Sequence, residues 1–422
     1  MTKWKRAIPN GTHDILFEQC SLKVDIEQTL RGVFRSRGYK EIRTPTMEFY
    51  DVFSFNGIDE EKMFKFFDHR GRIVVLRPDM TIPIARVIGT TTTTLPLKVT
   101  YSGNVYRVNT SLKGKQNEVT QTGIEIIGVR SLRAEVECVI SAIRALQAVG
   151  INDFKIEIGH AKLYKLLKTY VEMTEEEEKT LRTCIGNKSY SSLRQFFQNI
   201  SSHAYMEEIE LLKSLPRLFG SIDVINRAKE MTANVAIHEA LEEIRIIYDI
   251  VEQLGYGEYV AVDLGMVQNI HYYTGVIFRG YAEQIGEEIV SGGRYDTLME
   301  QFGSSQPAIG LALQVNQLVR MKYGSNEALR PSEEVLIHYQ LSDMERAEIV
   351  AETYRTKGVV AELSPYELLD ETKRYAREHR IHTIIHIEED VHVYEWNSEW
   401  VQKEGDDSGT NTNSIDEREI VG

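Results

Sequence analysis

Runs of apolar side chains predict a mixed fold in the first part of the chain. Residues from about 15 to 37 carry apolar groups at helical spacing, and Gly38 follows as a stop signal. Alternating apolar runs then predict two antiparallel hairpins, at 64–79 and at 97–128. An amphipathic helix is predicted at about 133–149. We therefore expect an antiparallel sheet that is covered by helices.

The pattern changes between about residues 161 and 255, where nearly every segment is charged and has helical spacing. Strand-like runs then return at 259–267, 272–281, 288–298 and 308–314. The block 161–255 is thus predicted to be a helical insertion, after which the sheet is completed. Residues 1–324 should form one core that contains this insertion.

A second domain is predicted after a polar, turn-rich linker at 323–334. Strand and helix patterns alternate over residues 333–395, which is typical of a small α/β domain. Residues 402–422 are polar and acidic with few large apolar groups, so we expect a disordered tail there. The predicted fold class is α+β: an antiparallel sheet flanked by helices, a helical insertion and a small C-terminal α/β domain.

Composition narrows the class of protein. Of the 422 residues, 42% are hydrophobic and 27% are charged, which is close to the globular average. No apolar run approaches the length of a membrane span, and the N-terminal segment lacks a signal-peptide core, so we expect a cytoplasmic protein. The three cysteines are widely spaced, which disfavours a disulfide framework and a metal site. The net charge of −14 opposes binding to tRNA or DNA.

The motif "LRPDMT" groups three polar side chains. It places Arg77, Asp79 and Thr81 in alternation, and in a strand this spacing would put them on one face. An acid and a hydroxyl in that arrangement could hold an ammonium group. A solvated strand end would show the same pattern, so the motif alone leaves both interpretations open.

The motif "QTGIEIIG" repeats this arrangement, with Gln121 and Glu125 on the same side of a predicted strand and a glycine between them. Such a combination suggests a small polar pocket, because buried polar groups need partners. Three tyrosines could add hydroxyls to it: Tyr272, Tyr273 and Tyr295. Each tyrosine, taken singly, is equally compatible with a core aromatic whose hydroxyl is satisfied.

Eight short motifs occur together in the order and spacing of histidyl-tRNA synthetase, a class II synthetase. They are "PNGTHDIL", "GYKEIRTPTME", "LRPDMT", "YSGNVYR", "QTGIEIIG", "YYTGVIF", "SGGRYDTL" and "AIGLAL". The chain resembles that family from about residue 3 to residue 321, and more loosely in the C-terminal domain. The resemblance implies the class II sheet with its helical insertion, and a C-terminal domain similar to the synthetase's anticodon-binding module.

The resemblance also implies a histidine-binding site. In that family an acid, a Thr and a Gln hold the α-amino group of the amino acid, and a Glu and a Tyr meet its imidazole. The matching positions here are Asp79, Thr81 and Gln121 for the amino group, and Glu125 and Tyr272 for the imidazole. Asp79 is one carbon shorter than the usual acid. Three more residues complete the candidate set: Arg107, Tyr273 and Tyr295.

Positions that bind phosphate in the synthetase have lost their charge in this chain. The catalytic Arg of the family falls on Gln268, and two further Arg positions fall on Asn117 and Gln317. An amide cannot supply the permanent cation that steadies a carboxylate and an α-phosphate during adenylation. Whether the retained Arg107 and Arg294 contact phosphate or only brace the fold stays open. The resemblance thus implies histidine binding without catalytic residues, metal or cofactor.

A retained histidine pocket with lost ATP chemistry is similar to the regulatory-subunit family of ATP phosphoribosyltransferase. This resemblance implies a short-form catalytic subunit as partner, which joins ATP to phosphoribosyl pyrophosphate in histidine biosynthesis. The chain would activate that subunit and transmit feedback inhibition by histidine. It would also form a dimer within a larger hetero-oligomer, with no tRNA and no membrane as partner. Two alternatives remain: a divergent active histidyl-tRNA synthetase, and a synthetase-like amino-acid sensor with another partner.

Overall fold

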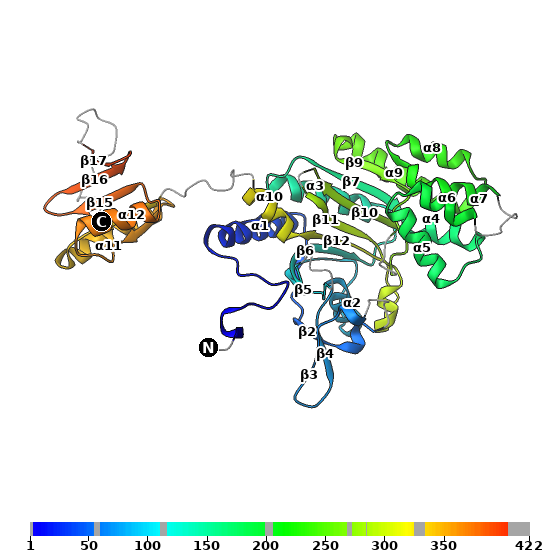
Figure 1. The fold of residues 1–422 in the computed structure, drawn as a ribbon, viewed down its shortest axis with the longest axis horizontal. Coiled ribbons are helices and arrows are strands. Elements are labelled where there is room, and N and C mark those ends of the chain that lie inside the picture. The colour runs from blue at the N-terminus through cyan, green and yellow to red at the C-terminus, as the bar shows by residue number, and fades with distance from the viewer. Residues whose placement is uncertain are drawn as a thin grey trace. The chain divides into compact units, whose positions relative to one another are not determined.

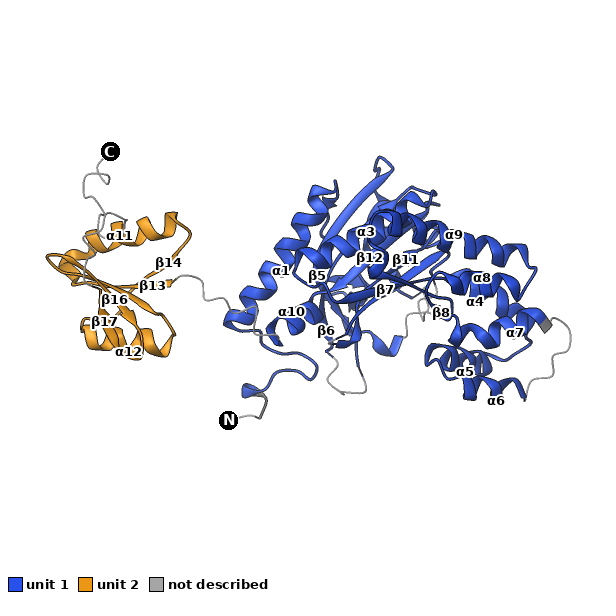
Figure 2. Ribbon diagram, turned by 90° about the horizontal axis from the view of Figure 1, so that it is seen from above, with its two compact units in different colours: residues 1–328 blue, residues 329–422 orange. Residues whose placement is uncertain are grey.

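The computed structural model divides the chain into two compact units, residues 1–328 and 329–422 (Figure 2). Its described residues are 3–54, 60–109, 116–198, 206–267, 272–283, 285–324 and 334–403. Among the helices in these ranges, none combines the length and hydrophobicity that crossing a membrane requires.

A nine-stranded sheet organises the first unit (Figure 1). Its strand order is β1-β5-β6-β12-β11-β10-β7-β9-β8, and neighbours are antiparallel except for the pairs β1 with β5 and β7 with β9. The strands are β1 Lys40–Glu41, β5 Leu97–Tyr106, β6 Glu118–Ile127, β7 Phe154–His160, β8 Phe219–Gly220, β9 Val260–Asp263, β10 Val276–Ala282, β11 Ile285–Arg294 and β12 Ala308–Gln314. The sheet is mixed, and the predicted class II synthetase-like architecture is confirmed.

One face of this sheet is covered by long helices. They are α1 Phe17–Ser36, α3 Arg133–Ala148, α9 Val235–Gln253 and α10 Val315–Gly324. Side chains from all four helices join one apolar core with alternate positions of the strands, among them Ile124 and Ile126 of β6. Because strand side chains alternate between faces, residues 121, 123 and 125 of β6 point to the opposite side of the sheet.

The opposite face carries a second, smaller core. It packs against α2 Thr81–Thr90 and a three-stranded sheet of order β2-β4-β3. These strands are β2 Met47–Phe49, β3 Lys65–Phe67 and β4 Ile73–Leu76. The antiparallel pairing of β3 with β4 confirms the first predicted hairpin.

The prediction that residues 77 to 81 alternate along a strand was wrong. Strand β4 ends at Leu76 and α2 begins at Thr81, so Pro78 lies in the connection between them. A proline lacks the N–H that would continue the ladder. The guanidinium of Arg77 instead donates to the backbone carbonyls of Asn104 and Thr44, at 2.8 Å each.

The helical insertion consists mainly of short helices. They are α4 Ala161–Leu167, α5 Glu175–Gly186, α6 Tyr190–Gln198, α7 Met206–Ser214 and α8 Asp223–Glu230, and the long α9 returns the chain to the sheet. The start of α5 follows from its sequence, because Thr174 and Glu177 form a reciprocal capping box. The short strand β8 pairs with β9 and ties the insertion to the edge of the sheet.

The second unit is a five-stranded sheet of order β14-β13-β15-β16-β17. Figure 2 shows its two helices, α11 Met344–Thr356 and α12 Leu369–Glu378, on opposite faces. The strands are β13 Glu334–His338, β14 Val360–Leu363, β15 Thr383–Ile387, β16 Val391–Trp396 and β17 Trp400–Gln402. The first three are parallel and the last two antiparallel, so the predicted small α/β domain is confirmed.

The sheet of this unit continues beyond residue 395, where the sequence pattern ends the domain. Strand β17 includes Gln402, and the backbone N–H of Lys403 donates to the carbonyl of Val393 at 2.9 Å. Residues 402 and 403 are therefore part of the sheet edge and not of a tail. Residues 404–422, which make up the rest of the expected tail, lie outside the described residues.

Two buried histidines lie side by side on one face of the C-terminal sheet, and they make the stability of this unit depend on pH. The ring of His338 lies 4.7 Å from the ring of His386, and its Nδ1 is 2.8 Å from Oγ1 of Thr372. Burial lowers the pKa of His338 to about 4, and the nearby His386 adds to this shift. Burial also lowers the pKa of His386. The folded unit therefore resists protonation that the unfolded chain accepts.

We predict that acid destabilises the C-terminal unit selectively. A histidine with a lowered pKa in the folded state contributes stability above its unfolded pKa, and this is lost as pH falls toward the folded pKa. For His338 the loss should be about 2 kcal/mol of unfolding free energy between pH 7.5 and pH 5. Urea unfolding followed by Trp396 and Trp400 fluorescence measures it.

Two substitutions identify the group responsible. His338→Asn retains a polar side chain without a titrating ring and should flatten the pH dependence. The exposed His382 lies beside the same sheet, so His382→Asn is the matched control and should leave the pH dependence unchanged. An equal loss of stability with acid in wild type and His338→Asn would contradict the assignment.

Candidate functional site

The centre of the candidate site is the buried carboxyl of Glu125. It lies on β6 and is 1% exposed, on the face of the sheet that carries the smaller core. The hydroxyl of Thr81, at the start of α2, donates to Oε1 at 2.8 Å. The hydroxyl of Tyr295, just after β11, donates to Oε2 at 2.5 Å. Both carboxyl oxygens are thus held by groups that are far apart in the sequence.

A second acid continues this arrangement. The hydroxyl of Tyr272 lies 3.4 Å from Oδ2 of Asp79, and Oδ1 of Asp79 accepts the backbone N–H of Ile82 at 2.8 Å. The ring of Tyr272 meets the ring of Tyr295 edge-on, with centroids 5.8 Å apart. The two acids therefore belong to one group of residues. We call it the carboxyl cluster: Asp79, Thr81, Glu125, Tyr272 and Tyr295.

Burial disfavours ionisation of the two carboxyl groups of the cluster. Desolvation raises the pKa of Glu125 to about 8, and the charge of Asp79 adds to the shift, while the hydroxyls of Tyr295 and Thr81 oppose it. Desolvation also raises the pKa of Asp79, and the nearby Arg107 opposes that shift. Much of the Glu125 carboxyl is accordingly protonated at neutral pH. A cation or an N–H donor placed beside it would favour the ionised form.

Neighbouring strands leave room for the cluster at two glycines. A Cβ atom on Gly310, which pairs with Glu125 across β12 and β6, would lie 1.5 Å from Oε2 of Glu125. A Cβ atom on Gly123 would lie 2.4 Å from the hydroxyl of Tyr101, the residue opposite it on β5. Sequence reasoning missed Tyr101 and Gly310. Tyr101 could have been found by pairing the two strands of the predicted hairpin at 97–128, because this places it opposite Gly123.

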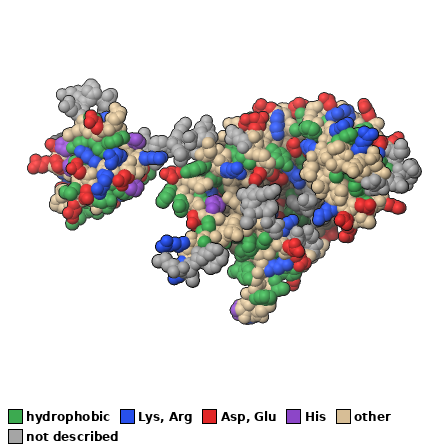
Figure 3. Space-filling view, in the orientation of Figure 1, with side chains coloured by type: hydrophobic (Ala, Val, Ile, Leu, Met, Phe, Trp, Pro, Cys, Tyr) green, Lys and Arg blue, Asp and Glu red, His purple; other side chains and the backbone are tan. Residues whose placement is uncertain are grey.

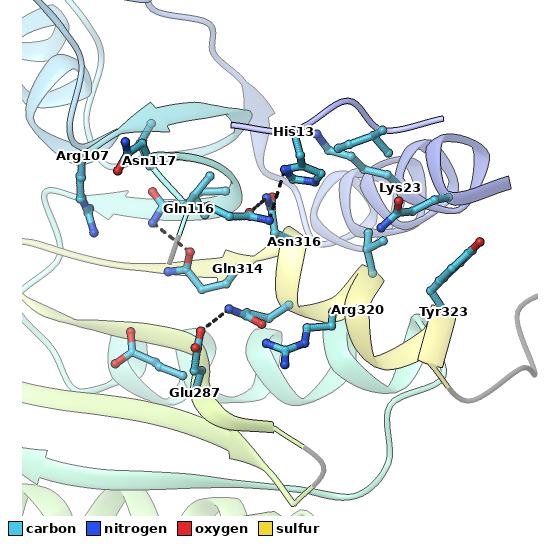
Figure 4. A pocket seen from close by; sticks show the side chains of 18 of the residues that line it. His13, Lys23, Arg107, Gln116, Asn117, Glu287, Gln314, Asn316, Arg320 and Tyr323 are labelled. Carbon is cyan, nitrogen blue, oxygen red and sulfur yellow. Dashed lines mark hydrogen bonds between the residues drawn. The ribbon is translucent and has the colours of Figure 1, made fainter. Parts of the chain in front are cut away.

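Figure 4 shows a large cavity of about 840 Å³, which is reached along β6 from Glu125, because Gln121 on the same face of that strand lines it. The N-terminal segment and α1, strands β5, β6 and β11, and α10 contribute to its wall. Arg107 and Gln121 line it. The Nε of Arg107 donates to the carbonyl of Pro78 at 2.7 Å, and Nε2 of Gln121 donates to Oε1 of Gln314 at 3.4 Å. Arg107 thus contacts the residue that precedes Asp79. Gln121 lies on the same strand as Glu125.

Amides line the cavity at two positions that the sequence resemblance matches to phosphate-binding arginines. Among the described residues, Asn117 bonds to backbone groups: its Oδ1 accepts the N–H of Asn109 and its Nδ2 donates to the carbonyl of Asn10, at 2.9 Å each. Gln317 donates to Glu287 (Figure 4). The side chains of both amides therefore make hydrogen bonds within the protein. Gln268, the third such position, lies outside the described residues.

Arg294 braces the fold. Its guanidinium forms a two-point ion pair with the buried Glu135 of α3 and donates to the carbonyl of Val129 at 3.0 Å. A further bond of 3.1 Å joins it to Asp296. Because these donors already bond to other groups of the protein, the contacts of Arg294 support a role in bracing the fold.

Tyr273 takes a different position from its neighbour. Its ring lies 5.1 Å from the ring of Tyr272, but it lines a second, small cavity together with Lys165 of the insertion. The structure thus brings together five of the eight candidates in the carboxyl cluster. It places Arg107 and Gln121 at the large cavity beside the cluster, and Tyr273 behind it. Within the described residues, no three His, Cys, Asp or Glu side chains gather as a metal site would require.

Comparisons with known proteins are consistent along almost the full chain. The family profile described as histidyl-tRNA synthetase matches residues 11–318. An ATP phosphoribosyltransferase regulatory subunit from Bacillus mycoides (strain KBAB4) is 51% identical over 413 residues, which cover 97% of this chain and 98% of that protein. A protein of the same name from Bacillus cereus (strain AH820) has the same identity and coverage.

Solved structures give the same relationship. The crystal structure of an ATP phosphoribosyltransferase regulatory subunit/histidyl-tRNA synthetase from Bacillus halodurans C has a TM-score of 0.78 and 31% identity, covering 88% of this chain and 97% of that one. Histidyl-tRNA synthetase from Nostoc sp. PCC 7120 has a TM-score of 0.77 at 20% identity, covering 95% and 97%, which shows a shared fold. With half of its residues identical to those of the Bacillus proteins, the chain belongs to the family of ATP phosphoribosyltransferase regulatory subunits, which has the histidyl-tRNA synthetase fold.

Proposed function

We propose that this protein is a non-catalytic regulatory subunit that activates a short-form ATP phosphoribosyltransferase and transmits feedback inhibition by histidine. The observation that carries the proposal is the contrast between two adjoining sites. The carboxyl cluster holds its acids in defined positions, whereas the phosphate-binding positions of the adjoining cavity hold amides that bond to the protein. Recognition of an amino acid is supported, and transfer of a phosphate group is not.

Histidine recognition rests on complementary charge and hydrogen bonding. The α-amino group would be held by Asp79, Thr81 and Gln121, and the imidazole by Glu125 and Tyr272. The raised pKa of Glu125 suits this role, because an N–H donor that favours the ionised carboxyl gains from being buried beside it. Arg107, Tyr273 and Tyr295 would orient these groups from the sides.

The adjoining cavity is poorly suited to ATP. Its wall holds Lys23, Arg107 and Arg320, but it also holds the carboxyl groups of Glu287 and Glu288, which offset much of that positive charge. A triphosphate needs several cations, and removing even one well-placed donor costs about 10²- to 10³-fold in rate. With amides at 117 and 317, adenylation of histidine and charging of tRNA have too little charge stabilisation. The protein would therefore need no cofactor and no tRNA partner.

Regulation through such a site is a matter of linkage. Histidine can shift the activity of a bound catalytic subunit only by the difference between its affinities for two states of the complex. The carboxyl cluster is built from β6, the start of α2 and the chain after β11, so a ligand there touches three separate parts of the core. A ligand that draws these parts together would favour one arrangement of the core over another.

A dimer through the synthetase-like core is supported by an exposed apolar surface. Hydrophobic side chains gather along the β3–β4 hairpin and its neighbour β2 (Figure 3). Met47, Phe49 and Phe66 are exposed on one face of this small sheet, because Phe49 and Phe66 both pair with Val74 and Met47 pairs with Leu76. Contiguous exposed apolar side chains of this kind mark association surfaces in soluble proteins. We call this group the hairpin surface.

The regulatory function is tested by reconstitution. Phosphoribosyl-ATP formation by a short-form catalytic subunit should rise when this chain is added, and it should fall again as histidine is titrated. The chain alone should not exchange pyrophosphate into ATP in the presence of histidine. Histidine-dependent exchange would instead identify an active synthetase, and histidine binding without any effect on the catalytic subunit would identify a sensor with another partner.

A second prediction concerns Glu125 and protons. At pH 7 most of this carboxyl is protonated, because its pKa is raised to about 8, so binding of histidine with a neutral imidazole should release the carboxyl proton to the buffer. Calorimetry in two buffers of different ionisation enthalpy measures that release. Glu125→Gln should abolish it and weaken binding by about 1.5–3 kcal/mol, the value of a charge-assisted hydrogen bond. Unchanged affinity and unchanged proton release would place histidine elsewhere.

A third prediction concerns the hairpin surface. Phe49→Glu should weaken dimerisation about tenfold or more, because a charge would be buried among apolar groups. Analytical ultracentrifugation over a range of concentrations measures this. Val235→Glu is the control, since Val235 is 71% exposed at the start of α9 in the insertion. Equal dissociation constants for both variants and the wild type would rule out the hairpin surface as the dimer contact.

A further inference from the structure

A small cavity of about 80 Å³ lies between the helical insertion and the sheet, behind Tyr273. Helix α4, the 3-10 turn Lys168–Tyr170 that follows it, and α5 supply its polar side, and the segments around β9 and β10 supply its apolar side. The polar lining residues are Tyr164, Lys165, Lys168, Glu178 and Arg182. Neither the carboxyl cluster nor the large cavity includes any of these side chains.

The charges around this cavity do not balance. Three cations face it with one carboxylate: Glu178 lies 2.8 Å from Nζ of Lys168 and 3.8 Å from Nε of Arg182. The ammonium of Lys165 donates to the carbonyl of Tyr273 at 2.6 Å, which is a neutral partner. Burial lowers the pKa of Lys165, and repulsion from Lys168 lowers it further. The site therefore favours the addition of negative charge.

An unsatisfied hydroxyl points to the same conclusion. Tyr164 is 7% exposed, and its hydroxyl finds no hydrogen-bond partner among the described residues. A buried donor without an acceptor is costly, so such groups are rare in folded proteins. Tyr164 and Lys168 are one helical turn apart, which places the hydroxyl donor and an ammonium group at the same cavity.

We propose that this cavity binds one small tetrahedral oxyanion, inorganic phosphate. One such group can accept the Tyr164 hydroxyl and also compensate Lys165 and Arg182. Phosphate suits the site better than a carboxylate, because it has more acceptor oxygens for converging donors. The cavity volume equals that of about two to three water molecules, which admits one oxyanion but no nucleotide.

The location gives such an anion a route to the carboxyl cluster. Lys165 joins the cavity to the backbone of Tyr273, and Tyr273 directly follows Tyr272 of the cluster. Holding Lys165 in place would therefore also hold the tyrosine pair. Anion binding itself does not depend on the proposed regulatory function, so either can be tested alone.

The test is a calorimetric titration of the full-length protein with inorganic phosphate at constant ionic strength, without histidine and without a catalytic subunit. The wild type should bind one phosphate saturably. Arg182→Gln should weaken binding about tenfold or more, since it removes a charge-assisted hydrogen bond. Tyr164→Phe removes the hydroxyl alone and should weaken binding several-fold.

Lys179→Gln supplies the matched control. Lys179 is on the same helix as Arg182 but is exposed and does not line the cavity, so its removal changes net charge equally and should leave phosphate affinity unchanged. Circular dichroism of each variant checks the fold. Equal weakening by Lys179→Gln and Arg182→Gln, or unsaturable binding by the wild type, would overturn the proposal and leave the regulatory function standing.

Discussion

The buried carboxyl of Glu125 is the group on which the rest of the site depends. Burying an acid without partners is costly, and here the cost is offset by two hydroxyl donors from separate parts of the chain, Thr81 and Tyr295. Those donors can arrive only because Gly310 leaves space on the adjacent strand. The position of α2 and the course of the chain after β11 are therefore coupled to one side chain.

The same sheet carries two sites of opposite character. The carboxyl cluster is enclosed and acidic, and it suits a ligand with N–H donors. The large cavity beside it is lined by amides and by charged groups of both signs, with Gln317 bonded to Glu287 and Asn117 bonded to backbone groups. A synthetase requires both amino-acid recognition and phosphate stabilisation, whereas a sensor requires only the first. A protein can therefore keep the synthetase fold with amides at positions 117 and 317, because the fold depends on packing whereas the chemistry depends on a few charged side chains.

Periodicity in the sequence was sufficient to predict the strongly patterned elements. Ile124 and Ile126 alternate with Glu125, so both the strand β6 and the direction of its polar side chains followed from local sequence. The polar alternation at residues 77–81 led to the wrong prediction of a strand there, because the strand ends before Pro78. Tyr101 and Gly310 were missed because they meet the site through strand pairing between distant segments, which local pattern does not specify. Gln268, the strongest sequence argument against catalysis, lies outside the described residues, so Asn117 and Gln317 carry that argument structurally.

The central claim is that the carboxyl cluster senses histidine on behalf of another subunit. Its most direct test is the histidine titration of a reconstituted complex that contains either the wild-type chain or Glu125→Gln, with phosphoribosyl-ATP formation as the readout. The account predicts equal activation by both chains, with at least about tenfold more histidine needed for half-inhibition of the variant complex. Superimposable inhibition curves would contradict it, because histidine would then act at a site that does not involve Glu125.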